Sequence, residues 1–121
     1  MAPDGDDLLA QQLRQLRREY LADSVHRVAE LRALQADLAA DQRTALGKLR
    51  QAFHRLAGSG GSYGFPAVST RSREAEGLAQ RLESAGTPLA SSDLSAIDAC
   101  ITGIDRAFGD ARTAMETEST A

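Results

Sequence analysis

The chain lacks tryptophan and has one cysteine, three prolines and few aromatic residues, which make up 4% of its 121 residues. The single cysteine, Cys100, excludes an internal disulfide and any multi-cysteine zinc or iron–sulfur site, and it suits a reducing compartment. No apolar run approaches the roughly 20 residues that a membrane span needs. The N-terminus is acidic, whereas a signal peptide is basic there. We therefore expect a cytoplasmic protein that does not associate with a membrane.

A large excess of charge of one sign is also missing. The 14 Lys and Arg residues against 17 Asp and Glu residues give a net charge of -3, which argues against a nucleic-acid partner. The hydrophobic fraction of 42% is enough for a core without disulfides or metal. Ala, Leu and Arg are the most frequent residues, and all three favour helices over sheets. The composition predicts a single all-α domain.

Apolar residues recur at helical spacing along most of the chain. The spacing predicts an additional short N-terminal helix over about residues 6–20, a bend near residues 20–23 where Asp23 and Ser24 offer an N-cap, and an antiparallel four-helix bundle over about residues 22–115. Residues 116–121 are predicted to fray as a tail. The residues expected on the apolar faces are Leu9, Leu13 and Leu16; Leu21, Val25, Val28, Leu31 and Leu38; Leu46, Leu49, Phe53, Leu56 and Tyr63; Val68, Ala75, Leu78 and Leu82; and Leu94, Ile97, Ile101, Ile104 and Phe108.

Capping residues mark the ends of the later helices. Asp41 is predicted to cap a helix that ends at Gly64, and Pro66 suits the first turn of the next one. Gly86 is the following stop, after which the last helix begins near Ser91. The short connections predict that neighbouring helices run antiparallel.

One histidine lies in a segment that is unusually rich in glycine. Five of the ten glycines lie between Gly47 and Gly64, although each costs a helix about 1 kcal/mol relative to alanine. At about 100° per residue, His54 lies roughly 100 to 135° from the centre of the core stripe, on an accessible flank. The same strip carries Gly47, Arg50, Gly58 and Gly61. It lacks the further ligands of a metal site, and it leaves room for a second protein to bring a reacting group against the imidazole.

The phosphorylation motif of histidine-containing phosphotransfer (HPt) domains resembles the stretch from Ala52 to Phe65, which reads AFHRLAGSGGSYGF. The family pattern has a histidine, an aliphatic residue two positions later, usually a lysine at three, a glycine at four, then small residues, and a glycine at ten followed by an apolar residue. The resemblance extends in weaker form over almost the whole chain. It implies a four-helix bundle with a short preceding helix and with His54 midway along the second bundle helix.

The resemblance also implies a function. His54 would accept a phosphoryl group on a ring nitrogen, Nε2, and exchange it with an aspartate of a response-regulator receiver domain. Glu76 lies on a flank that can face His54, and in some family members an acid or amide at this distance binds Nδ1 and orients the ring. The protein would be a monomeric phosphocarrier rather than an enzyme, because the chain has no phosphate-binding loop for ATP. It would receive its phosphoryl group from a histidine kinase or hybrid kinase, and Mg²⁺ would come with the receiver, not from a cofactor of its own.

The sequence departs from the family pattern at Ala57, where a lysine is usual. Arg50, one turn before the histidine, and Arg55 are the candidates to bind the phosphoryl oxygens instead, because guanidinium geometry suits phosphate. The residues expected to contact the partner are Gly47, Ala57, Gly58 and Gly61.

Other interpretations remain open for the same residues. Gly60 falls on the core stripe, where glycine permits close helix packing, and Glu76 could be an ordinary solvated acid. His26 is interpreted as a surface residue and Cys100 as a small packing residue. Two other functions compete with phosphotransfer. A helical adaptor would bind a receiver without accepting phosphate, as Ala57 suggests. The second alternative is the dimerisation and phosphoacceptor module of a sensor histidine kinase. That module normally has an acid directly after its histidine, where this chain has Arg55.

Overall fold

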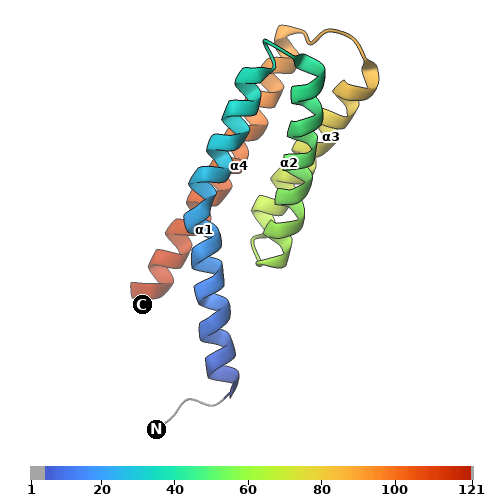
Figure 1. Ribbon diagram of the computed structural model, residues 1–121. Coiled ribbons are helices and arrows are strands. Elements are labelled where there is room, and N and C mark those ends of the chain that lie inside the picture. Colours follow the sequence, from blue (N-terminus) through green and yellow to red (C-terminus); the bar gives the residue numbers. More distant parts are fainter. Residues whose placement is uncertain (1–4, 121) are drawn as a thin grey trace.

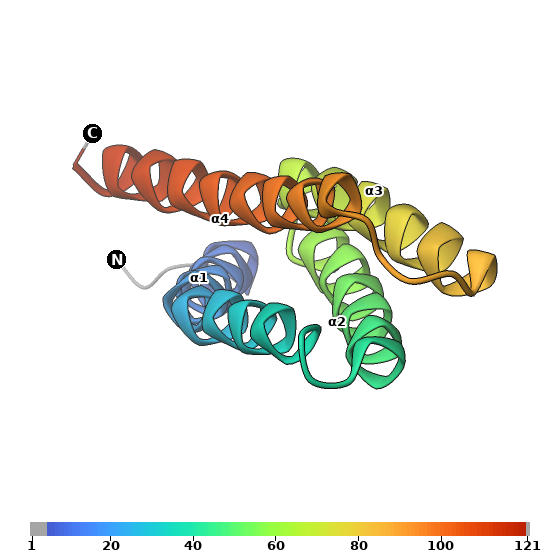
Figure 2. The same cartoon turned by 90° about the horizontal axis from the view of Figure 1, so that it is seen from above.

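Four long α-helices form the part of the chain that the structure describes. The structure is a computed structural model that describes residues 5–120, with the side chains of residues 5–118. The helices are α1 (Gly5–Asp37), α2 (Gln42–Ser62), α3 (Pro66–Ala85) and α4 (Ser91–Thr120). They alternate in direction along the chain (Figure 1), and each packs against two others, so that the four helices form a closed ring. Figure 2 views the same arrangement from above. The predicted all-α antiparallel bundle is thereby confirmed. No helix within residues 5–120 is long and apolar enough to cross a membrane.

The ends of the helices follow from local sequence. The side chain of Asp41 accepts a hydrogen bond from the backbone N–H of Thr44 at 3.3 Å and so caps α2, as predicted. Pro66 occupies the first turn of α3, where its missing N–H would have no partner in the helix. Gly64 and Gly86 both adopt positive φ, +83° and +66°, which a side chain would disfavour. These four residues confirm the predicted boundaries of α2 and α3.

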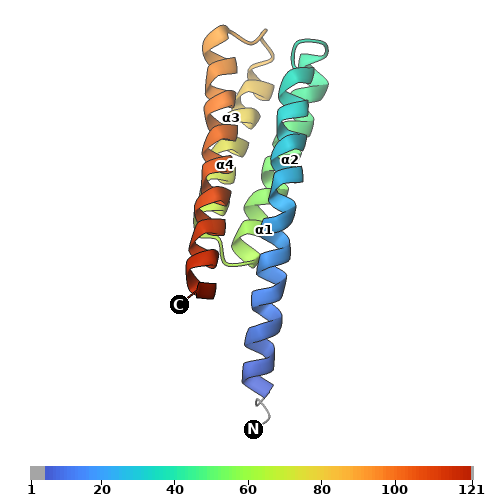
Figure 3. The same ribbon diagram turned by 90° about the vertical axis from the view of Figure 1, so that its left-hand side faces the viewer.

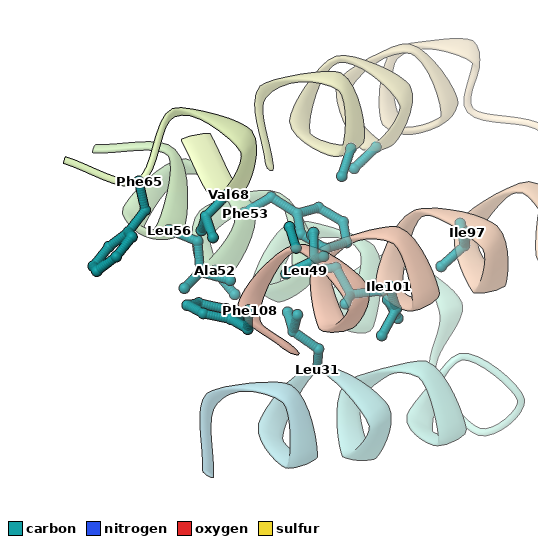
Figure 4. Close-up of a cluster of buried hydrophobic side chains, with 14 of the residues drawn as sticks. Leu31, Leu49, Ala52, Phe53, Leu56, Phe65, Val68, Ile97, Ile101 and Phe108 are labelled. Carbon is teal, nitrogen blue, oxygen red and sulfur yellow. The ribbon is translucent and has the colours of Figure 1, made fainter. Parts of the chain in front are cut away.

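The hydrophobic core lies along the axis of the ring, between all four helices. Figure 4 shows side chains from α1, α2, α3 and α4 meeting there, with Phe53 and Phe108 among the largest that are fully buried. Each fully buried side chain of this size stabilises the fold by roughly 1.5 to 3 kcal/mol. The predicted core residues that the structure buries are Leu21, Leu31, Leu38, Leu46, Leu49, Phe53, Leu56, Val68, Ala75, Ile97, Ile101, Ile104 and Phe108.

The prediction of a separate N-terminal helix is wrong, because α1 runs without a break through residues 20–23. Ser24 does not cap a helix. Its buried hydroxyl donates to the carbonyl of Leu21 in the preceding turn and accepts from Arg112 on α4. Asp23 pairs with Arg27 one turn later, at 3.1 Å, which supports helix at this point. Residues 6–20 are therefore the first half of the first bundle helix.

The N-terminal half of α1 extends beyond the ends of the other helices (Figure 3). Its predicted apolar face is uncovered there, with Leu9, Leu13 and Leu16 at 64%, 53% and 49% exposure. Val25 and Leu94 were also expected to face inward and are exposed. Helical spacing identified the apolar stripe correctly, but which part of it is buried depends on how far the neighbouring helices reach.

The predicted tail is wrong as well, because α4 continues to Thr120 and does not end near Met115. Met115 is buried, so the helix still has a packing residue at that point. The hydroxyls of Thr113 and Thr117 bond back to carbonyls one turn earlier, both at 3.0 Å. Ala121 lies outside the described residues.

A close approach of α2 and α3 fixes how these two helices align. A Cβ atom on Gly60 would lie 2.9 Å from Cγ1 of Val68 and 3.1 Å from the backbone nitrogen of Ser69, so the two backbones meet where Gly60 has no side chain. The hydroxyl of Ser69 donates to the carbonyl of Ala57 at 2.7 Å and joins the helices at the same level. The interpretation of Gly60 as a packing glycine is confirmed.

The turn between α2 and α3 is held against α1. The ring of Tyr20 stacks on Tyr63 and Phe65, with ring centres 4.5 and 5.8 Å apart, and its hydroxyl shares a 2.7 Å hydrogen bond with Ser59. Burial raises the pKa of the Tyr20 hydroxyl above its ordinary value. Arg17 donates to the carbonyl of Tyr63 at 3.0 Å and lies over the ring of Phe65. These contacts fix the turn and therefore the position of α3 along the axis of α2.

Two neighbouring glycines should respond to alanine with opposite sign. We expect Gly60→Ala to lower the free energy of unfolding by about 1 kcal/mol, because the clash with Val68 and the Ser69 backbone outweighs the better helix propensity. Gly58→Ala should raise it by about 0.5 to 1 kcal/mol, since nothing lies within 4 Å of its Cβ position. Urea unfolding of both variants measures the difference. Equal effects would contradict the close approach of α2 and α3.

Candidate functional site

His54 lies on the rim of α2 that faces α3, with its side chain 74% exposed. Its Nδ1 is 3.0 Å from Oε1 and 3.2 Å from Oε2 of Glu76, a residue of α3 whose side chain is 27% exposed. An ionised carboxylate only accepts hydrogen bonds, so this contact favours the tautomer of the neutral ring that carries its proton on Nδ1 and leaves the lone pair on Nε2. No hydrogen bond within the described residues uses Nε2. The site is therefore an exposed imidazole whose tautomer is held from behind by a carboxylate.

The alignment of the two helices places Glu76 there. Three residues of α3 that are spaced seven apart contact α2 in turn: Ser69, Glu76 and Glu83. Seven residues are nearly two helical turns, so all three lie on one face of α3. Sequence reasoning identified only Glu76, although this spacing was already visible. Ser69 and Glu83 fix the alignment on either side of the histidine.

Two glycines keep the surface beside His54 bare. A Cβ on Gly58 would meet nothing within 4 Å, which is open space. A Cβ on Gly61 would make an ordinary contact with Ser69 at 3.5 Å, and both glycines are exposed. Gly47, expected on the same surface, lies where a Cβ would be 3.4 Å from the carboxylate of Glu83. Gly58 thus leaves the most room for a large partner to approach the ring.

Ala57 does not belong to this surface, which corrects the prediction that it contacts a partner. Its side chain is only 5% exposed, and its carbonyl accepts the hydrogen bond from Ser69. The physical reason is the close approach at Gly60, which brings α3 over this side of α2.

The two arginines considered as phosphate ligands lie in different surroundings. Arg50 donates from Nε to Oε1 of Glu83 at 2.6 Å, in a partly buried pair, so its charge is already neutralised. Arg55 is exposed and follows His54 by one residue, which turns it about 100° further round α2, away from α3. The structure therefore places neither guanidinium as a free cation beside the imidazole.

The remaining candidates lie elsewhere. His26 is exposed on α1. Cys100 on α4 is half-buried against the core, and burial, followed by the nearby charge of Glu74, raises the pKa of its thiol. Across the described residues, no three His, Cys, Asp or Glu side chains gather as a metal site.

The sequence matches one family of known proteins over most of its length. Residues 7–107 of the 121 residues match the family described as the Hpt domain. The chain belongs to the Hpt family. Hpt domains are helical histidine phosphotransfer modules of phosphorelays. They are phosphocarriers rather than enzymes. No curated protein and no solved structure matches the chain. The predicted resemblance is confirmed over most of the length.

The contact between Glu76 and His54 makes a testable prediction for this Hpt domain. Removing the carboxylate in Glu76→Ala should reduce the fraction of the imidazole protonated at Nδ1, because nothing then selects that tautomer. Long-range ¹H–¹⁵N correlation spectra of His54 measure this fraction. Glu76→Gln, which keeps an acceptor oxygen, should retain most of it, and an unchanged tautomer in Glu76→Ala would contradict an orienting role.

Proposed function

We propose that this Hpt domain is a phosphocarrier that accepts a phosphoryl group on Nε2 of His54 and exchanges it with the aspartate of a response-regulator receiver domain. The observation that carries the proposal is the hydrogen bond of 3.0 Å between Nδ1 of His54 and Glu76. It leaves the nucleophilic nitrogen of an exposed ring free while its other nitrogen is fixed.

The transfer step uses only groups at this site and on the partner. The lone pair of Nε2 attacks the phosphorus of the aspartyl phosphate and forms a P–N bond, while the P–O bond breaks and its electron pair stays on the leaving carboxylate. The ring becomes positively charged and keeps its proton on Nδ1, where the carboxylate of Glu76 stabilises it. In the reverse step an oxygen of the receiver's aspartate forms a P–O bond while the P–N bond breaks and its electron pair returns to Nε2. The same histidine therefore gives up the group without any change of tautomer.

The partner must reach the ring across the bare surface at Gly58 and Gly61. Docking of this kind is weak and transient, which suits a carrier that meets both a kinase and a receiver. We expect the histidine kinase or hybrid kinase to load His54 and the receiver's acidic pocket to supply Mg²⁺. The carrier would act as a monomer in the cytoplasm.

Replacement of the acceptor tests the proposal directly. We expect His54→Gln to abolish acid-labile, base-stable phosphorylation and to leave the helical circular dichroism unchanged, because an exposed side chain leaves no cavity behind. The matched control is His26→Gln, which removes the other histidine and should be labelled like the wild type. An adaptor that only binds a receiver would leave the wild type unlabelled, and label persisting in His54→Gln would rule out His54 as the acceptor.

A large side chain on the bare surface should separate docking from chemistry. Gly58→Leu places a side chain one turn after His54, over the same strip. We expect it to slow transfer from a phosphorylated receiver by more than tenfold, because the protein partner can no longer approach in line. Labelling by phosphoramidate, a small donor, should fall far less. Equal loss with both donors would mean that Gly58 does not serve partner access.

A further inference from the structure

Phosphorylation would concentrate negative charge at the rim between α2 and α3. A phosphoryl group adds about 1.5 to 2 negative charges near neutral pH. Glu76 already lies within hydrogen-bond distance of the same ring, and the charge of Arg50 is taken up by Glu83 at 2.6 Å. A stable phosphohistidine at this position therefore calls for a cation that is not already paired.

Arg73 occupies the matching place on α3. It follows Ser69 by four residues and precedes Glu76 by three, and both of these neighbours contact α2. Residues three and four apart lie on one side of a helix, with Cβ atoms about 5 to 6 Å apart. Ser69 reaches Ala57, and Glu76 reaches His54. Arg73 lies between these two contacts, level with the start of the bare surface.

The guanidinium of Arg73 is free to move toward the histidine. Arg73 is exposed, and none of the hydrogen bonds or ion pairs within residues 5–118 involves it. The residues across from it on α2 present no obstacle, since Ala57 is short and buried and Gly58 faces open space. Its planar fork of N–H groups can donate two parallel hydrogen bonds to phosphoryl oxygens.

We propose that Arg73 binds the phosphoryl oxygens of phosphorylated His54 from across the α2–α3 interface. The inference rests on the proposed phosphorylation of His54. Arg73 exchanges no proton and no electron pair in the step. It donates N–H groups to the non-bridging oxygens while the bond from phosphorus to the donor breaks and the bond from phosphorus to Nε2 forms. It thereby offsets the charge that Glu76 and the phosphoryl group bring together.

A donor without a protein partner separates phosphoryl binding from docking. With phosphoramidate, whose P–N bond breaks to release ammonia, we expect Arg73→Ala to label His54 about tenfold more slowly than the wild type, a barrier change of about 1.4 kcal/mol. Arg73→Lys should keep most of the rate, because the charge remains. The matched control is Arg81→Ala. Arg81 is an exposed arginine of the same helix, on the side near Cys100 of α4, so this variant should be labelled at the wild-type rate.

A second measurement reads the contact itself. A nearby cation favours the dianion, so the pKa of the phosphoryl group on His54, followed by ³¹P NMR, should be higher in Arg73→Ala than in the wild type. An unchanged rate and an unchanged pKa would overturn the role of Arg73 while leaving phosphorylation of His54 intact. If labelling is slow in Arg50→Ala but proceeds at the wild-type rate in Arg73→Ala, the cation is Arg50, and the role of Arg73 is overturned too. A wild type that carries no label on His54 would overturn both proposals.

Discussion

The close approach of α2 and α3 at Gly60 is the constraint on which the rest of the site depends. Because Gly60 has no side chain, Val68 and the backbone of Ser69 can lie against α2, and Ser69 bonds to the carbonyl of Ala57. That contact fixes the helices lengthwise, and Glu76, nearly two turns further along α3, then meets the imidazole. The glycines of this segment therefore serve two ends, since Gly60 lets the helices meet and Gly58 leaves the surface open.

The charges at the site are arranged so that the histidine is fixed but not covered. Glu76 holds Nδ1 from the side of α3, and the pair between Arg50 and Glu83 closes the same interface one turn away. A carboxylate beside an exposed imidazole would favour the positive ring that forms in the proposed transfer. The carboxylate would also repel the incoming phosphoryl group. In our proposal the positive charge of Arg73, on the same helix as Glu76, offsets that repulsion.

Sequence reasoning succeeded where local interactions decide the structure and failed where distant residues do. The cap at Asp41 depends on a backbone group three residues away. Helical geometry put Glu76 on a flank that can face His54, and the family resemblance supplied its expected role. The predicted bend near residues 20–23 is absent, and the hydroxyl of Ser24, expected to cap a helix, is bound instead by Arg112, 88 residues later in the chain. The burial of Ala57 likewise depends on α3, which no spacing within α2 reveals.

We infer that the alignment of α2 and α3 selects which nitrogen of His54 reacts. The most direct test is the long-range ¹H–¹⁵N spectrum of the phosphorylated protein, in which coupling to ³¹P identifies the phosphorylated nitrogen. We predict phosphorus on Nε2 and a proton on Nδ1. Phosphorus on Nδ1, which in this structure faces the carboxylate of Glu76, would contradict it.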